Sequence, residues 1–415
     1  MTFSTAEESV APRGVLIHTL LLATAAQIVA TCSVLALTAL APAVAVGVGL
    51  DAHFIGYQVS VIYAAGMVTS AIAGNLVQRF GGAWVEVVAL SCFALGFIGL
   101  ASASTPLMLA ATLVIGCGYG LNNPAASEML TPVTPARLRN LVFSFKQSGV
   151  PLGGVAASAV LPVLEMHVGW RAGLALAAAA PVAVGIWLVA THAGHTPPAG
   201  VRRGFGRGII EEQAHIWKDH GLRVLSLLGL VYSALQLSVS AFMVVALVHD
   251  AGWGVLAAGG LAASTQLAGA FGRIGWGIVA DRLGGEFRTL ALIGLISGLA
   301  CLPLPMLSSL AFPAQMGVFL LLGGSSIGWN GVFLAAVARH APAGRVGAAT
   351  GAVLVYTFIG VIVGPSGFAA LYSVIGNYGG AFAVFSAFGL VGAVMSFLAH
   401  RRQLRSGMAR PGTAP

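Results

Sequence analysis

The feature that most constrains this chain is a near-continuous succession of apolar runs, each about 20 residues or longer. A helix of that length crosses a hydrocarbon core of about 30 Å. The alternating segments of about ten residues that are typical of membrane β-barrel strands are not seen. The sequence therefore predicts an all-α integral membrane protein. The twelve predicted spans are 16–42, 53–77, 84–104, 106–131, 138–164, 169–191, 222–248, 255–280, 287–308, 312–338, 345–372 and 378–400.

The composition favours the same class. Only 8% of the 415 residues are charged, whereas soluble domains carry about 25%. This shortage excludes an ordinary soluble globule and a disordered chain, and the predicted loop positions of the basic residues argue against nucleic-acid binding despite a net charge of +8. All four cysteines lie inside apolar runs without a C-x-x-C pair, so we interpret them as buried apolar side chains and expect no metal site.

One long polar stretch, 192–221, divides the spans into two sets of six. Its first part is rich in Pro and Gly, and residues 209–220 are compatible with a short surface helix. We therefore predict a six-helix bundle over 1–191, a central loop over 192–221, a second six-helix bundle over 222–400 and a tail over 401–415.

The distribution of Lys and Arg predicts the orientation of the spans. With the N-terminus inside, 17 of the 20 basic residues fall in inside loops or at inside ends of spans. Basic residues in short loops stay on the cytoplasmic side of a membrane. The prediction is a multi-pass protein of a bacterial inner (plasma) membrane, with both termini and the central loop in the cytoplasm.

Two internal matches relate the halves of the chain. Residues 74–82 read G-N-L-V-Q-R-F-G-G and residues 277–285 read G-I-V-A-D-R-L-G-G, an offset of 203. Residues 120–122 (G-L-N) match residues 328–330 (G-W-N) at an offset of 208. Both halves begin inside, so the repeat is parallel, with its axis along the membrane normal.

The G-x-x-x-D-R-x-G-G pattern resembles the signature loop of the major facilitator superfamily, and the resemblance covers nearly the whole chain. It implies two pseudo-symmetric six-helix bundles around a central cavity, with alternating access. It also implies that the loop charges help to latch the cytoplasmic side. The first copy departs from the pattern at Gln78, where the family usually has Asp. The gating candidates are Gly74, Arg79, Gly277, Asp281 and Arg282.

Two cations, Lys146 and Arg273, lie within predicted spans. They are ~10 Å and ~13 Å from the cytoplasmic ends at 1.5 Å per residue. A charge at that depth costs a few kcal/mol and needs a partner, water or a substrate. Glu128, near the inner end of the fourth span, is a plausible partner for Lys146 and the candidate proton carrier. Snorkelling of Lys146 to the surface is the alternative.

Arg273 has no evident partner in its own span. Gln266 lies seven residues earlier and shares its helix face. A guanidinium offers a planar fork to a carboxylate. Residues 266–282 also resemble the eighth helix of oxalate- and monocarboxylate-type members of the superfamily, which implies that Arg273 contacts an anionic substrate.

Polar and aromatic residues of other spans could complete a pocket, and the resemblance implies that their spans face the cavity. Packing between helices is the alternative role for each of them. The candidates are Gln27, Tyr63, Asn123, Gln236, Trp329, Asn330 and Tyr356.

These observations predict a secondary active transporter, symporter or antiporter, for a small organic anion such as a carboxylate. We expect a monomer in lipid that uses a proton or a counter-substrate and needs no cofactor. No catalytic or phosphate-binding motif favours an enzyme. Two alternatives remain: efflux of lipophilic drugs or other metabolites by the same fold, and a membrane protein that transports nothing.

Overall fold

The computed structural model describes residues 12–49, 52–192 and 205–405. Predictions that fall on other residues, including the first part of the central loop and most of the tail, lie outside the described residues. All the regular elements of the described chain are helical, which confirms the all-α prediction. The first bundle contains α1 (Arg13–Ala39), α2 (Ala41–Val48), α3 (Ala52–Phe80), α4 (Gly82–Leu100), α5 (Thr105–Leu130), the short turns η1 (Thr131–Val133) and η2 (Ala136–Leu138), α6 (Arg139–Gln147), α7 (Gly149–Ala177) and α8 (Ala179–His192).

Helix α9 (Phe205–Lys218) precedes the second bundle and agrees with the short helix expected near the end of the polar stretch. The second bundle contains α10 (His220–His249), α11 (Val255–Leu283), α12 (Glu286–Cys301), η3 (Leu304–Ser309), α13 (Phe312–Leu322), the π-helical turn η4 (Gly323–Ile327), α14 (Asn330–His340), α15 (Val346–Ile375) and α16 (Tyr378–Arg405).

The described helices supply twelve membrane passes, as the sequence predicts. Nine stretches are long and apolar enough to cross a membrane, and one of them, Ala136–Thr191, has 56 residues. This stretch turns at Gly169, whose φ of 79° is a left-handed value that favours glycine, so it supplies two passes. Helices α11 and α12 supply the other two. The observed bounds lie within a few residues of most predicted ends.

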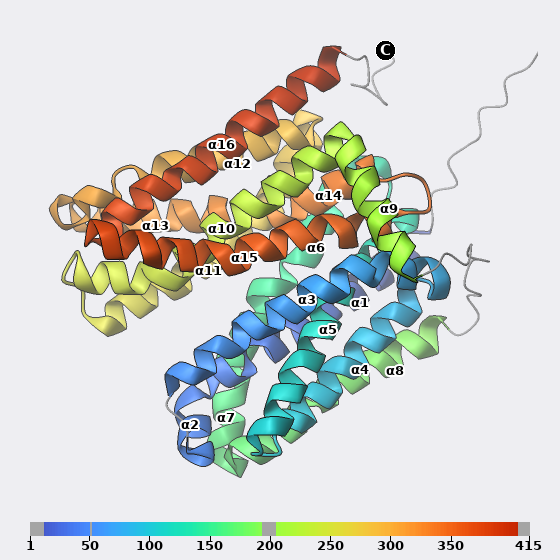
Figure 1. Ribbon diagram of the computed structural model, residues 1–415, viewed down its shortest axis with the longest axis horizontal. Helices are drawn as coiled ribbons and strands as arrows, with labels where there is room; N and C mark the ends of the chain where they lie inside the picture. The colour runs from blue at the N-terminus through green and yellow to red at the C-terminus, as the bar shows by residue number, and fades with distance from the viewer. Residues whose placement is uncertain (1–11, 50–51, 193–204, 406–415) are drawn as a thin grey trace, which may run out of the picture.

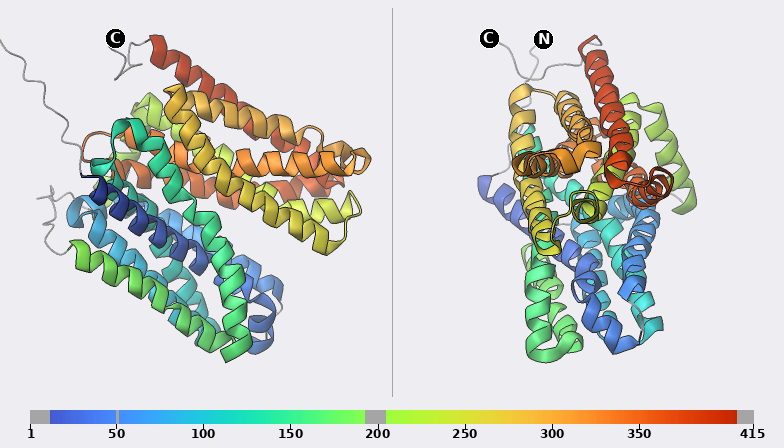
Figure 2. Two further views of the ribbon diagram at one scale, coloured as in Figure 1. Left: turned by 180° about the vertical axis from the view of Figure 1, so that it is seen from behind. Right: turned by 90° about the vertical axis from the view of Figure 1, so that its left-hand side faces the viewer.

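The two bundles meet at one end and diverge toward the other (Figure 1). The meeting end carries α9 and the end of α16, and we call it the closed end. The diverging end carries α2 and the turn between α10 and α11, and we call it the open end. The left view in Figure 2 shows the same arrangement from behind.

The hydrophobic core explains why only one end is joined. One cluster of buried apolar residues continues across both bundles, from Leu22 and Ala125 to Phe333 and Val353. A second cluster, which includes Val239 and Phe382, stays within the second bundle. Apolar burial stabilises contacts in proportion to area, so the shared core holds the bundles together at the closed end.

Small residues bring α3 and α15 into close contact across the bundles. A Cβ atom added to Gly74 would lie 2.7 Å from the Cα atom of Ala348. One turn earlier, the Ser70 hydroxyl donates a 2.8 Å hydrogen bond to the carbonyl of Gly351. Small residues permit such close approach of membrane helices. In the related position of the repeat, α11 packs against α6 in the same way.

Candidate functional site

Lys146 is buried at the centre of the molecule within a cage of amide oxygens. Its Nζ atom donates to Oε1 of Gln27 at 2.6 Å, to Oδ1 of Asn123 at 2.6 Å and to Oδ1 of Asn122 at 3.4 Å. The side chain is 1% exposed. An ammonium group has three N–H donors, and here each of them has an acceptor. Helices α1 and α5 therefore hold two of the predicted site residues, Gln27 and Asn123, against Lys146.

Glu86 extends this cage by one step. Its Oε1 atom accepts a 2.6 Å hydrogen bond from Nδ2 of Asn122, which also faces Lys146. Glu86 and Asn122 are both fully buried, and Oε2 of Glu86 has no hydrogen-bond partner. Glu86 is not among the site residues predicted from the sequence. An acidic residue within the first turns of an apolar span is the signal that could have found it.

Glu128 does not pair with Lys146, contrary to the interpretation from sequence. Its Oε2 atom accepts a 2.7 Å hydrogen bond from the backbone N–H of Gly347, in the first turn of α15. The reason is helix rotation: the carboxylate is aimed at the other bundle, while Lys146 points into its own. Whether Glu128 carries a proton stays a prediction.

Arg273 is also buried, at 1% exposure, and it bonds to carbonyls of both bundles. Its Nε atom donates to the carbonyl of Ile327 at 3.0 Å, and Nη1 donates to the carbonyl of Gln147. Ile327 belongs to the π-helical turn η4. The Nε1 atom of Trp276 donates to a second carbonyl of that turn, Gly324, at 2.8 Å. A π-helical turn in a helix frequently marks a functional site.

The two buried cations are close neighbours. Gln147, whose carbonyl binds Arg273, follows Lys146 directly in the chain, and the two positive charges interact electrostatically. In the described residues, neither cation forms an ion pair with a carboxylate. The centre of the molecule therefore concentrates positive charge that neutral oxygens solvate, together with the single carboxyl group of Glu86.

Three aromatic rings from the two bundles meet where α3, α5 and α15 converge. Tyr63 and Tyr119 are T-shaped with centroids 5.6 Å apart. Phe358 of α15 lies 6.0 Å from the Tyr63 ring and 6.2 Å from the Tyr119 ring. Phe358 is 3% exposed, so this layer excludes water where α3, α5 and α15 converge. Tyr63 is among the site residues predicted from the sequence, whereas Phe358 is not.

Three further predicted residues form a cluster within the second bundle. Oε1 of Gln236 accepts hydrogen bonds from Nε1 of Trp329 at 2.8 Å and from Nδ2 of Asn330 at 3.0 Å. Trp329 is 1% exposed and its ring is T-shaped to Tyr232 and Phe333. The packing role that the sequence left open is thus visible for Trp329, whereas the Nε2 end of Gln236 is not used in these two bonds.

Tyr356 and Gln266 are not part of these clusters. Tyr356 faces α9, where its hydroxyl donates to Oε1 of Gln213 at 3.0 Å and accepts from Nε1 of Trp217 at 2.6 Å. The expected position of Tyr356 in the central pocket is therefore wrong, because the opposite face of α15 contacts α3. Gln266 is exposed, two turns from Arg273 along α11, and its role stays a prediction.

Of the five gating candidates, three contact the other bundle and two are exposed charged residues. The Asp281 carboxylate accepts from Nδ2 of Asn140 at 2.8 Å and from the backbone N–H of Leu141 at 3.0 Å, at the start of α6. A Cβ atom on Gly277 would lie 2.7 Å from Cβ of Ser144. Gly74 is equally close to α15. The remaining two, Arg79 and Arg282, are exposed.

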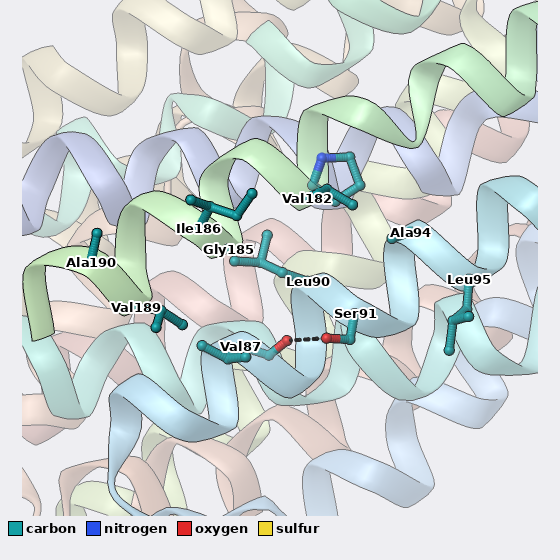
Figure 3. A pocket seen from close by; sticks show the side chains of 11 residues that line it. Val87, Leu90, Ser91, Ala94, Leu95, Val182, Gly185, Ile186, Val189 and Ala190 are labelled. Atoms are coloured by element: carbon teal, nitrogen blue, oxygen red, sulfur yellow. Dashed lines mark hydrogen bonds between the residues drawn. The ribbon is translucent and has the colours of Figure 1, made fainter. Parts of the chain in front are cut away.

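A cavity of about 610 Å³ lies elsewhere, on the flank of the first bundle. Figure 3 shows it between α4 and α8, lined by apolar side chains such as Leu90, Val182 and Ile186. It holds no charged group. The polar side chain in its lining is Ser91, whose hydroxyl donates to the carbonyl of Val87 within α4. Such a lining offers little to orient a polar ligand, so we place the candidate site at the buried cations.

The chain belongs to the Major Facilitator Superfamily. The family model matches residues 22–365, which covers both bundles. This membership agrees with the two six-helix bundles and with the signature loops at 74–82 and 277–285.

Relatives with curated descriptions match parts of the chain. An uncharacterized MFS-type transporter of Mycobacterium tuberculosis is 28% identical over 237 residues, which is 55% of this chain and 51% of that protein. The 4-hydroxybenzoate transporter PcaK of Pseudomonas aeruginosa is 31% identical over 154 residues, 36% of this chain and 34% of that protein. Sugar transport protein 5 of Arabidopsis thaliana is 31% identical over 162 residues, 37% of this chain and 30% of that protein. The matches thus span about half of the length of these relatives or less.

Solved structures match over the whole fold. The human organic anion transporter MFSD10 superposes with a TM-score of 0.75 at 16% identity, covering 92% of this chain and 99% of that chain. At that identity the likeness shows the fold alone. The oxalate and monocarboxylate branch suggested by residues 266–282 stays a prediction.

Proposed function

We propose that this protein transports a small organic anion, most simply a monocarboxylate, across a membrane by alternating access. The observation that carries the proposal is the buried pair Lys146 and Arg273, whose hydrogen-bond partners in the described residues are neutral oxygens. Two buried positive charges with only one carboxyl group nearby, that of Glu86, leave an excess of positive charge that attracts an anion, because charges are weakly screened inside a membrane protein.

Arg273 is the residue suited to orient the substrate. Nε and Nη1 bond to protein carbonyls, which fix the plane of the guanidinium. The third nitrogen, Nη2, would meet the carboxylate. Lys146 would add a second donor by exchanging one amide partner for the substrate. Charge-assisted hydrogen bonds of this kind are worth about 1.5–3 kcal/mol each.

The arrangement of the bundles suggests how the substrate reaches the site. The described structure is joined at the closed end and diverges at the open end. In our proposal the closed end faces the cytoplasm, since it carries most of the basic residues. A substrate would then enter from outside, and rocking of the bundles would separate α3 from α15 and α6 from α11.

The names of known proteins that this chain resembles support the substrate class. The names of PcaK and of MFSD10 include an aromatic carboxylate and organic anions, respectively. Another relative is named as a sugar transport protein. The buried cations favour the anion over the sugar, because a neutral sugar would leave the excess positive charge of the site uncompensated.

Counterflow in proteoliposomes tests the proposal. Vesicles loaded with one unlabelled carboxylate are diluted into a trace of the same labelled compound, and a panel of mono- and dicarboxylates is compared with a neutral sugar and a lipophilic cationic dye. We expect labelled monocarboxylate to accumulate transiently above the level of empty liposomes. Movement of the sugar or the dye alone would overturn the proposal, and movement of the dye would favour the efflux alternative.

A further inference from the structure

A buried carboxyl group, Glu86, lies one amide away from the proposed substrate-binding cation. The chain of contacts runs from Glu86 through Asn122 to Lys146, with 2.6 Å and 3.4 Å between the bonded atoms. All three side chains are at most 1% exposed. The second oxygen of Glu86 has neither a hydrogen-bond partner nor access to solvent. Burying a carboxylate oxygen without a partner is costly, whereas a protonated carboxyl tolerates it better.

From this geometry we infer that Glu86 is the proton-binding site that couples transport to a proton gradient. The inference rests on the proposed function, since it assigns the coupling ion of the same site. It also replaces Glu128, whose carboxylate bonds to α15, as the coupling candidate.

The charged surroundings of Glu86 leave Lys146 as its counter-charge. Helix α5 contributes the neutral Asn122, which bonds to Glu86. It also contributes Glu128, which lies beside the first residue of α4 but whose carboxylate bonds to Gly347. Arg79 at the end of α3 is exposed. In the described residues, no side chain of α1, α3, α7 or α8 bonds to the Glu86 carboxyl group. Whether Glu86 is protonated therefore depends on how strongly its carboxyl group interacts with the positive charge of Lys146.

A charge balance shows how substrate and proton would move together. In the empty site, one carboxylate and two cations leave a net charge of +1. An arriving monoanion competes with Glu86 for Lys146, so the Glu86 carboxylate takes up one proton from water. The loaded site then holds a neutral carboxyl, two cations and one anion, again +1. The proton and the anion leave together on the other side, and Glu86 returns to the carboxylate.

The position of Glu86 fits release toward the closed end. It is the fifth residue of α4, about 6 Å from the start of that helix at 1.5 Å per residue. Lys146 lies deeper. A proton on Glu86 would therefore have a shorter way to the water at the closed end once the bundles part there.

The experiment compares exchange with net transport. In proteoliposomes, we expect wild-type protein to accumulate the monocarboxylate about tenfold per unit of pH difference, the limit for one proton per anion. A potassium diffusion potential should change this little, because the cycle moves no net charge. Glu86→Gln should retain counterflow and lose accumulation. Glu165→Gln, a carboxyl group in α7 near the open end, is the matched control and should accumulate like wild type.

Two further measurements do not depend on the folding of Glu86→Gln. Asn122→Leu keeps the carboxyl group but breaks its link to Lys146, and it should also lose accumulation. In addition, infrared difference spectra of the substrate-free wild type between a low and a high pH should show the band of a buried carboxyl group that is protonated only at the low pH. Its absence, or full accumulation by Glu86→Gln, would overturn the inference. A wild type that shows this band but exchanges no anion would instead refute the proposed function.

Discussion

The Glu128 carboxylate in the first bundle accepts a 2.7 Å hydrogen bond from the backbone N–H of Gly347 in the second bundle. Gly347 is the second residue of α15, so a negative charge lies at the positive end of that helix. Asp281 does the same at the start of α6, from the second bundle to the first. Charge at a helix N-terminus stabilises it by about 0.3–1 kcal/mol, and by more when partly buried.

The internal repeat shows that these two carboxylate contacts between the bundles, which we call latches, use different positions in the two halves. At the offset of 203, Asp281 corresponds to Gln78, and at the offset of 208, Glu128 corresponds to Ala336. Each half thus carries one acidic residue where the other half has a neutral one. The first half has Gln78 in place of the usual Asp, and its acidic contact with the other bundle comes instead from Glu128, two helices further on.

Removing the negative charge of a latch residue should weaken the contact between the two bundles at the closed end. For Glu128→Gln and for Asp281→Asn we expect a loss of about 1 kcal/mol each in the preference for this state, or about fivefold. The double variant should show the sum, because the two sites share no partner. Spin-label distances across the closed end measure the shift, with Glu165→Gln as control. Unchanged distance distributions in the double variant would contradict this role.

The contact between Gly277 and α6 should not tolerate a larger side chain. Gly277→Val would place carbon atoms on Ser144 and on the carbonyl of Asn140, 2.7 Å and 2.9 Å from the added Cβ. We expect α11 and α6 to separate at the closed end and counterflow to fall at least tenfold. Gly275, two residues earlier on α11, has no atom within 4 Å of an added Cβ, so Gly275→Val should exchange normally. Equal activity of the two variants would refute the prediction.

Arg273 should be essential for anion exchange. Arg273→Gln removes the charge, and Arg273→Lys keeps it but loses the fork that spans Ile327 and Gln147. Because one charge-assisted hydrogen bond is worth about 1.5–3 kcal/mol, we expect counterflow to fall at least tenfold in both. Arg288→Gln, an exposed charge of α12, controls for the loss of a basic residue. Size-exclusion profiles establish folding, and wild-type exchange by Arg273→Gln would exclude a substrate role.

Tyr356→Phe should affect stability rather than substrate affinity. It removes the hydrogen bonds to Gln213 and Trp217, each worth about 1 kcal/mol. We therefore expect a lower melting temperature and an unchanged KM for the transported anion. The opposite outcome, a raised KM with unchanged melting, would restore the position in the pocket that the sequence suggested.

Hydropathy and the internal repeat predicted the membrane passes well. Runs of about 20 apolar residues admit few structures other than helices in a membrane, because every backbone polar group must be bonded within the segment. Features that depend on a local change in backbone hydrogen bonding were not predicted. The π-helical turn at 323–327 and the break after Gln147 leave no mark in the hydropathy of their spans.

The candidate site was predicted in part. Depth along a helix correctly selected Lys146 and Arg273 as buried charges. Gln27 and Asn123 were predicted only as general pocket residues, and the structure places both against Lys146. Partners could not be predicted, because they depend on the rotation of one helix against another. That rotation placed Glu86 beside Asn122, turned Glu128 toward α15 and turned Tyr356 toward α9.

The sequence by itself determined the class of protein, the number of passes and the identity of the two deep cations, since these follow from local hydrophobicity and from the cost of burying a charge. Tertiary structure alone decided which groups satisfy those cations and which carboxylates join the bundles. The physical reason is that hydrogen bonds act over about 3 Å, and only the packed helices fix which atoms come within that distance.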